Sequence, residues 1–242
     1  MTRIEAGVIK ICVRQRKPQP KTNWGTGSII YARKDKKLIL TLILTAAHVT
    51  NRCMNIARLT REQINDRIQI TCLTESGELF AAKYVATPFA EFPDISLLET
   101  EFPFPGVPIP EFCQPGEYSS LTGATPVRIF GFADYSFQLQ AREAKFTGTD
   151  RLGNVCFSQT DIPNGFSGSP ILWGTKRIGM VTHHSTHHRR GFGPSVVTAR
   201  NSLTQWVNGP CQQNPSNPGT LFSQTNVEVS DEIKHILHQL TL

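Results

Sequence analysis

Short runs of apolar residues, separated by turn-forming residues, recur along most of the chain. Examples are "GVIKICV" at 7–13, "LILTLILTA" at 38–46 and "RIGMVT" at 177–182. These runs are rich in Val, Ile and Leu, and each has the length of a β-strand rather than that of a helix. Many short strands with turns between them are typical of a sandwich or barrel. The pattern therefore predicts an all-β fold, with neither a strand–helix alternation nor a fixed repeat.

Two irregular segments divide this pattern. The proline-rich stretch 99–117 predicts an extended connection, because proline fixes its own backbone and restricts the residue before it. The stretch "NGPCQQNPSNPG" at 208–219 marks a second break. We therefore expect an N-terminal unit over 1–105, a C-terminal unit over 106–208, and a linker with a final helix over 209–242.

The final stretch, "VSDEIKHILHQLTL", has the pattern of a helix. Ser230 is a predicted N-cap, and two acidic residues follow it in the first turn, where the helix dipole favours them. Four apolar residues then fall on one helix face, namely Ile233, Ile236, Leu237 and Leu240. This stripe can pack against the body of the protein, or residues 230–242 can dock a partner.

The composition is that of an ordinary globular protein. The chain has 242 residues, of which 39% are hydrophobic and 18% charged. No apolar run approaches the roughly 20 residues that a membrane-spanning helix needs, so we expect no membrane span. The first residues lack the pattern of a signal peptide. We expect a cytoplasmic protein, or one exported by a route that needs no N-terminal signal peptide.

Charge and cysteine content narrow the function classes. The net charge of +6 comes partly from short basic clusters such as "RQRK" at 14–17 and "RKDKK" at 33–37. Aromatic residues do not alternate with them, so we expect solvated loops and no nucleic-acid partner, with an RNA-binding β-protein as the weaker alternative. The six cysteines form no Cys-x-x-Cys pair, which argues against a zinc ribbon and favours free thiols. We expect no cofactor and no metal.

A candidate nucleophile lies in "NGFSGSP" at 164–170, where glycines flank Ser167. Such residues also dominate ordinary turns, so this stretch alone decides nothing. Serine attack on an acyl group needs a base and usually an acid that orients the base. Of the seven histidines, only His48 in "LTAAHVT" precedes Ser167, and Asp94 in "FPDISLLE" enters an apolar strand. Taken singly, each of these residues also fits a structural role.

Together, "TAAHV", "DISLL" and "GFSGSP" occur in the order His, Asp, Ser and resemble the trypsin-like, chymotrypsin-fold serine proteases. "GTGSII", "IGMVT" and "PSVVTARNSLTQWVN" are similar to further segments of that family, so the resemblance covers about 25–208. It implies two packed antiparallel β-barrels followed by a C-terminal helix, the first barrel carrying His48 and Asp94 and the second carrying Ser167. It also implies a serine endopeptidase that acts on a protein or peptide substrate, with an oxyanion hole formed by the amides of Gly165 and Ser167.

The competing α/β-hydrolase plan requires glycine two residues after the nucleophile, where this chain has Ser169. The chain also departs from the digestive proteases. Phe166 stands where those enzymes carry the aspartate that pairs with a newly cut N-terminus. We therefore expect activity without zymogen cleavage, closer to the glutamyl-endopeptidase, HtrA-like and viral branches. A catalytically inactive protein-binding module on the same scaffold is the main alternative.

The substrate pocket is less well defined. Asp161 lies six residues before Ser167, the spacing of the aspartate with which trypsin-type enzymes bind Lys or Arg, although HtrA-like enzymes carry a similar residue outside the pocket. Thr182, His183 and His184 follow the strand that lines the cleft in this family. The two histidines can form an exposed loop, favour acidic substrate residues, or bind a metal with His187 and His188. The metal alternative is weak because a four-residue spacing needs a helix.

Overall fold

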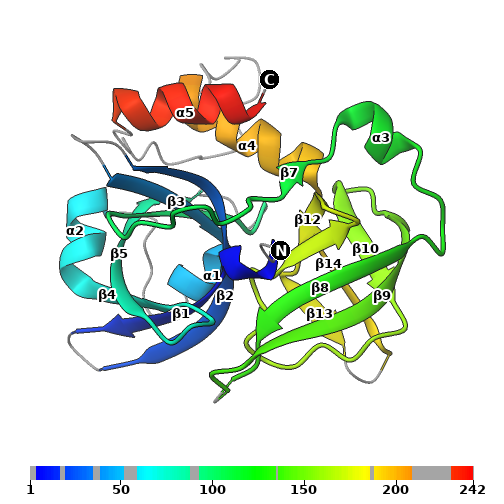
Figure 1. The fold of residues 1–242 in the computed structure, drawn as a ribbon, viewed down its shortest axis with the longest axis horizontal. Helices are drawn as coiled ribbons and strands as arrows, with labels where there is room; N and C mark the ends of the chain where they lie inside the picture. Colours follow the sequence, from blue (N-terminus) through cyan, green and yellow to red (C-terminus); the bar gives the residue numbers. More distant parts are fainter. Residues whose placement is uncertain are drawn as a thin grey trace, which may run out of the picture.

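The computed structural model describes residues 4–16, 20–34, 39–51, 59–87, 93–134, 136–185, 188–208 and 230–241. Two β-sheet units lie side by side, and two helices, α4 (Val196–Asn208) and α5 (Asp231–Thr241), run across one end of the molecule (Figure 1). The all-β fold expected from the sequence is confirmed.

The first unit is a closed barrel. Its strands are β1 (Val8–Gln15), β2 (Thr22–Lys34), β3 (Ile39–Thr45), β4 (Ile68–Leu73), β5 (Leu79–Ala86) and β6 (Ser96–Thr100). They are hydrogen-bonded in the order β1-β2-β3-β6-β5-β4, and every neighbouring pair is antiparallel. In β1, Ile9, Ile11 and Val13 are fully buried in the core. Because side chains alternate along a strand, Lys10 points to the outside of the barrel.

The second unit is an eight-stranded sheet in the order β13-β14-β10-β9-β8-β11-β12-β7. Its strands are β7 (Glu111–Phe112), β8 (Pro126–Phe132), β9 (Leu139–Thr149), β10 (Asn154–Ser158), β11 (Pro170–Trp173), β12 (Lys176–Met180), β13 (His183–Ser185) and β14 (Arg190–Pro194). Short β7 pairs parallel to β12, unlike the antiparallel pairs of the remainder.

This second sheet curls so that β12 approaches the end of β14. An isolated bridge joins Gly179 to Ser195. A Cβ on Gly193 would overlap the carbonyl oxygen of Met180, so only glycine allows the backbones to come this close. The second unit is thus a strongly curled sheet, in which this single bridge beside the end of β14 connects it to β12.

Short helices connect the strands. They are the 3₁₀ turn η1 (Ile4–Gly7) and the helices α1 (Ala47–Asn51), α2 (Arg61–Arg67) and α3 (Pro115–Ser119). Helix α2 begins at a capping box, in which Thr60 and Gln63 each bond the other's backbone amide. Helix α1 carries His48 and directly follows the barrel strand β3, so the position of His48 depends on a rigid element.

Helix α5 begins as the sequence predicts. The amide of Ile233 donates to the hydroxyl of Ser230 at 3.4 Å. The apolar stripe packs into the core of the chain itself, with Ile233, Ile236 and Leu237 almost fully buried. Because the chain covers this stripe, the alternative of a partner docking on 230–242 is not supported. The predicted linker at 209–229 lies outside the described residues.

Arg177 in β12 is a fully buried charge between the two units. Its Nη2 donates to the carbonyl of Ile29 in β2 at 3.1 Å, and its guanidinium lies 5.2 Å from the ring centre of Phe112. Nε and Nη1 have no hydrogen-bond partner among the described residues. Burial lowers the pKa of Arg177 to about 10, because the charged form loses its hydration.

Two expectations from composition can be compared with the described residues. Cys72, Cys113 and Cys156 are free thiols, as predicted, while Cys53 and Cys211 lie outside the described residues. No helix within the described ranges is both long enough and apolar enough to span a membrane.

Candidate active site

His48 is held in place through its backbone. Ala46 and Ala47, the two small residues before it, are buried where β3 passes into α1. The side-chain amide of Asn23 on β2 donates to the carbonyl of His48 at 3.0 Å and to that of Val49 at 2.9 Å. These contacts fix the turn, so the imidazole has a defined starting point.

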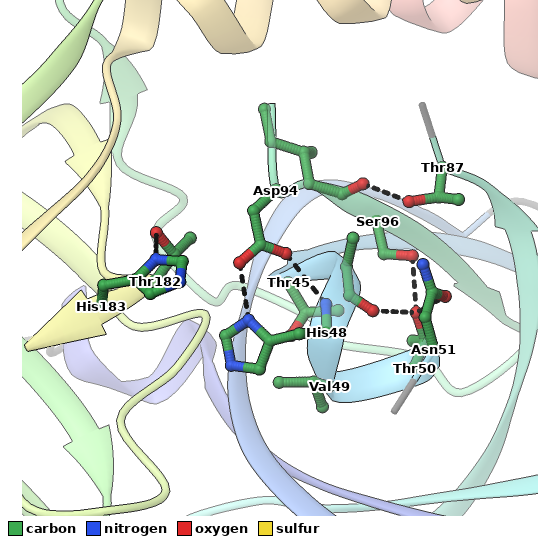
Figure 2. A network of polar contacts seen from close by, with 12 residues as sticks. Thr45, His48, Val49, Thr50, Asn51, Thr87, Asp94, Ser96, Thr182 and His183 are labelled. Atoms are coloured by element: carbon green, nitrogen blue, oxygen red, sulfur yellow. Dashed lines mark hydrogen bonds and ion pairs between the residues drawn. The ribbon is translucent and has the colours of Figure 1, made fainter. Parts of the chain in front are cut away.

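Asp94 binds His48 with both carboxylate oxygens. Oδ2 lies 2.6 Å from the imidazole Nδ1, and Oδ1 accepts the backbone amide of His48 at 2.9 Å (Figure 2). Asp94 is only 9% exposed, so water does not compete strongly for the carboxylate. A carboxylate on Nδ1 favours the tautomer that carries its proton there, which leaves Nε2 free to accept a proton.

Hydroxyl groups connect the segments that carry the acid and the base. Thr50 of α1 shares a buried hydrogen bond of 2.9 Å with Ser96 of β6 and donates to the carbonyl of Ala47 at 2.9 Å. Thr87 donates to the carbonyl of Ile95 at 2.6 Å, directly beside Asp94 (Figure 2). These bonds hold α1 and the start of β6 as one unit, so the distance between base and acid is fixed by the barrel.

Ser167 lies in the turn before β11 and is anchored to the first barrel. Its carbonyl accepts the amide of Thr26 at 2.8 Å. A Cβ on Gly25 would lie 3.0 Å from this carbonyl oxygen and would overlap the side chain of Val49, so the nucleophile loop and the residue after His48 meet on β2. Among the described contacts, the Ser167 hydroxyl has no hydrogen bond to His48. Such bonds often shorten only when substrate binds.

The peptide group before Gly165 has a fixed orientation. The amide of Asp134 donates to the carbonyl of Asn164 at 2.7 Å, and the hydroxyl of Thr26 donates to the carbonyl of Gly165 at 2.9 Å. In a trans peptide the N–H points opposite to the preceding carbonyl, so the Gly165 amide points away from Asp134. Neither this amide nor that of Ser167 meets an acceptor in the part of the chain that is described.

Glycine is required on both sides of Phe166 and Ser167. Gly165 has a φ of +95° and Gly168 a φ of +93°, a region that other residues seldom adopt. A Cβ at Gly168 would also overlap the carbonyl oxygen of Thr26. Phe166 itself is fully buried. The sequence "GFSG" therefore forms a tight loop whose phenylalanine is embedded in the core.

The position of Asp161 favours the second alternative that the sequence left open, a residue outside the pocket. Its neighbours Thr160 and Ile162 are buried, which turns the Asp161 side chain outward, where it is 68% exposed and lies 3.7 Å from Nε of Arg189. A carboxylate in this position is not the enclosed floor of a pocket for Lys or Arg. The physical reason is the alternation of buried and exposed side chains, which the spacing from Ser167 does not encode.

Thr182 and His183 lie to one side of the His48–Asp94 pair (Figure 2). The imidazole of His183 stacks on Phe192 at 5.0 Å and lies 5.9 Å from the ring of His48. Its Nδ1 is 3.0 Å from the hydroxyl of Thr182. The structure thus brings a second histidine beside the candidate base.

His184 is half-buried. Burial lowers its pKa, and the neighbouring charge of His183 lowers it further. Within the described ranges, no three His, Cys, Asp or Glu side chains come together as metal ligands. His187, which the metal alternative requires, lies outside the described residues.

Sequence reasoning did not single out Asn23 or Thr26. Thr26 is fully buried, and its hydroxyl also accepts the amide of Phe132 at 3.0 Å. A polar residue between two glycines, in "GTGSII", is the signal that could have indicated it.

The comparisons with known proteins agree with this geometry. A search of curated proteins gives no match to the chain. Residues 25–178, more than half of the chain, match the family described as the trypsin-like peptidase domain. The matched range contains His48, Asp94 and Ser167. The chain therefore belongs to the trypsin-like peptidase family.

Proposed function

We propose that this trypsin-like peptidase is a serine endopeptidase, with Ser167 as nucleophile, His48 as general base and Asp94 as the residue that orients the base. The observation that carries the proposal is the two-point contact of Asp94 with His48, through the imidazole Nδ1 and the backbone amide. A carboxylate that fixes both the ring and its backbone is suited to hold one tautomer in one orientation.

In the proposed reaction, Ser167 Oγ attacks the scissile carbonyl carbon while His48 Nε2 takes the hydroxyl proton. The imidazolium is stabilised by the Asp94 carboxylate, and it then protonates the leaving amine as the carbon–nitrogen bond breaks. This leaves an acyl ester on Ser167. Water attacks the ester while His48 again accepts a proton. His48 then returns this proton to Ser167 Oγ as the ester carbon–oxygen bond breaks, which releases the acid product and restores the Ser167 hydroxyl.

The amides of Gly165 and Ser167 are the proposed oxyanion donors. Both lack an acceptor among the described residues, and the positive φ of Gly165 sets the direction of its peptide group. One such donor is typically worth about 3 kcal/mol in the transition state. We propose that no zymogen cleavage is needed, because buried Phe166 stands before the nucleophile and requires no charged partner.

Thr182, His183 and His184 are the proposed substrate contacts, since His183 lies next to His48 at the candidate site. The Asp161 side chain is exposed beside Arg189, and this exposure does not favour a pocket in which Asp161 binds a Lys or Arg of the substrate. Imidazole groups in a cleft are suited to acidic substrate residues when they are protonated. A substrate-library profile of the residue before the scissile bond would decide the preference.

The test combines a fluorophosphonate probe with peptide hydrolysis. Wild type should be labelled in reducing buffer as translated, and Ser167→Ala should not be labelled. Ser167→Ala, His48→Ala and Asp94→Asn should each lower turnover by about 10⁴-fold or more. Ser119→Ala, an exposed serine on α3, is the matched control and should behave like wild type. A folded wild type that neither takes the probe nor hydrolyses peptides would instead indicate an inactive binding module.

A further inference from the structure

Lys10 is a buried lysine on the outside of the first barrel. Although it points away from the barrel core, it is only 3% exposed. Its ammonium donates to the carbonyls of Ala133 at 3.3 Å and Ser136 at 2.5 Å, both on the second unit. The ring centres of Trp24 and Phe137 lie 4.8 Å and 4.9 Å from Nζ. The lysine therefore joins the two units through a specific set of contacts.

A buried ammonium destabilises a protein unless its surroundings replace the lost hydration. Burial lowers the pKa of Lys10, whereas the nearby carboxylate of Asp134 raises it. Two carbonyl acceptors and two aromatic faces add to the stabilisation of the charge. One carboxylate oxygen of Asp134 is itself buried without a hydrogen-bond partner among the described residues. The Lys10 ammonium thus lies near a half-buried carboxylate beside the candidate site.

The segment that Lys10 holds is the one that orients Gly165. Asp134 lies between the two carbonyls that Lys10 binds, and its amide donates to the carbonyl of Asn164 at 2.7 Å. The Cα of Gly165 is packed so closely against this segment that a Cβ would lie 2.6 Å from the Asp134 amide nitrogen. Movement of this segment would therefore move the peptide that carries the Gly165 N–H.

Thr26 is the residue directly opposite Lys10 in the β1–β2 register. Side chains of such a pair stand on the same face of the sheet. Thr26 binds the carbonyl of Gly165, whereas Lys10 holds the segment that binds the carbonyl of Asn164. Two neighbouring side chains of the first barrel thus hold the peptide groups on both sides of the Gly165 Cα.

From these contacts we propose that Lys10 is a positioning residue, which fixes the Gly165 amide as an oxyanion donor by holding Ala133, Asp134 and Ser136. The catalytic part of this inference rests on the proposed peptidase function. The positional part does not, because it concerns the orientation of a backbone amide in the free protein.

The experiment measures position and catalysis separately in Lys10→Met, with Lys145→Met on β9 as the control for an exposed lysine. Amide hydrogen exchange by NMR should show the Asp134 amide exchanging about 10- to 100-fold faster in Lys10→Met, with barrel amides such as that of Ile43 unchanged. With a peptide substrate, kcat should fall about 10- to 100-fold while KM stays within about threefold, since a misplaced oxyanion donor acts on the transition state. Lys145→Met should match wild type in both.

Lys10→Gln is the second variant in case Lys10→Met does not fold. Its amide keeps two donors without the charge, so the same two changes should appear at smaller size. Unchanged Asp134 exchange in a folded variant overturns the inference. Faster exchange throughout the barrel, with kcat and KM altered together, also overturns it, because Lys10 would then be only structural. If wild type shows no Ser167-dependent turnover, the proposed function fails, yet the exchange rate of Asp134 still decides the role of Lys10.

Discussion

Replacing Thr26 by valine removes one hydroxyl from the contact between the two units. Valine keeps the shape of the side chain, so packing is little changed. The Thr26 hydroxyl donates to the carbonyl of Gly165 at 2.9 Å and accepts the amide of Phe132 at 3.0 Å, in a position with no exposed surface. Both backbone groups would lose their partner, and water has no access to replace it.

The expected loss follows from these two groups. Leaving a buried polar group unsatisfied costs about 1–3 kcal/mol, so the free energy of unfolding should fall by about 2–6 kcal/mol. Activity should fall as well, because the Gly165 peptide loses one of its two supports. Complete loss of an oxyanion donor lowers kcat about 10²- to 10³-fold. Since Asp134 still holds the Asn164 carbonyl, we expect a smaller decrease of about 10- to 100-fold for Thr26→Val.

Urea unfolding and peptide hydrolysis of wild type, Thr26→Val and Thr26→Ser would measure both effects. Serine keeps the hydroxyl and loses only the methyl group, so it should cost about 1 kcal/mol and leave kcat near wild type. The reasoning is refuted if Thr26→Val is as stable and active as wild type. It is also refuted if Thr26→Ser loses as much kcat as Thr26→Val, because the methyl group would then be the important part.

Two further predictions concern stability. Burial and the charge of His183 lower the pKa of His184 in the folded protein, whereas in the unfolded chain the pKa keeps its ordinary value of about 6.5. At pH values near and below 6.5 the unfolded chain therefore binds more protons than the folded protein. Stability should therefore fall as pH drops from 7 towards 5, and His184→Gln should show a smaller fall in melting temperature; equal profiles would contradict this sign. Arg177→Met should be neutral or stabilising by up to about 4 kcal/mol in urea unfolding, because it removes a buried charge of which two nitrogens have no hydrogen-bond partner among the described residues. Arg177→Ala, which also leaves a cavity, should be clearly less stable, and a large loss in Arg177→Met would show that its bond to Ile29 outweighs desolvation.

Local patterns in the sequence predicted many of the strands and the last helix. Apolar runs of strand length indicated the strands, and the Ser230 cap with its following stripe indicated α5. The contact of His48 with Asp94 also joins two segments that the ordered motifs had picked out. These features are local or repeat a family pattern, and so they can be read without knowing which residues meet in space.

The exposure of Asp161 could not be predicted from such local patterns. The spacing of Asp161 from Ser167 can be counted in the sequence. The exposure of its side chain depends instead on the burial of Thr160 and Ile162 in the folded protein. Lys10 is a second example, since a lysine in the run "GVIKICV" predicts a solvent-facing position on a barrel strand. It is buried because a second unit packs over that face and supplies two carbonyls more than a hundred residues later in the sequence.

The division of the candidate site between two units gives β2 a particular importance. The proposed base, His48, and its acid, Asp94, belong to the first barrel, whereas the proposed nucleophile and oxyanion donors belong to the loop before β11 in the second unit. Their alignment depends on the backbone amide and the hydroxyl of Thr26, which bind Ser167 and Gly165 respectively. Gly25 allows this approach, because a Cβ there would lie 3.0 Å from the Ser167 carbonyl oxygen, whereas a Cβ on Gly27 would overlap Ile11 and Ile43 inside the barrel. Substitutions in "GTG" should therefore change turnover without any contact with substrate.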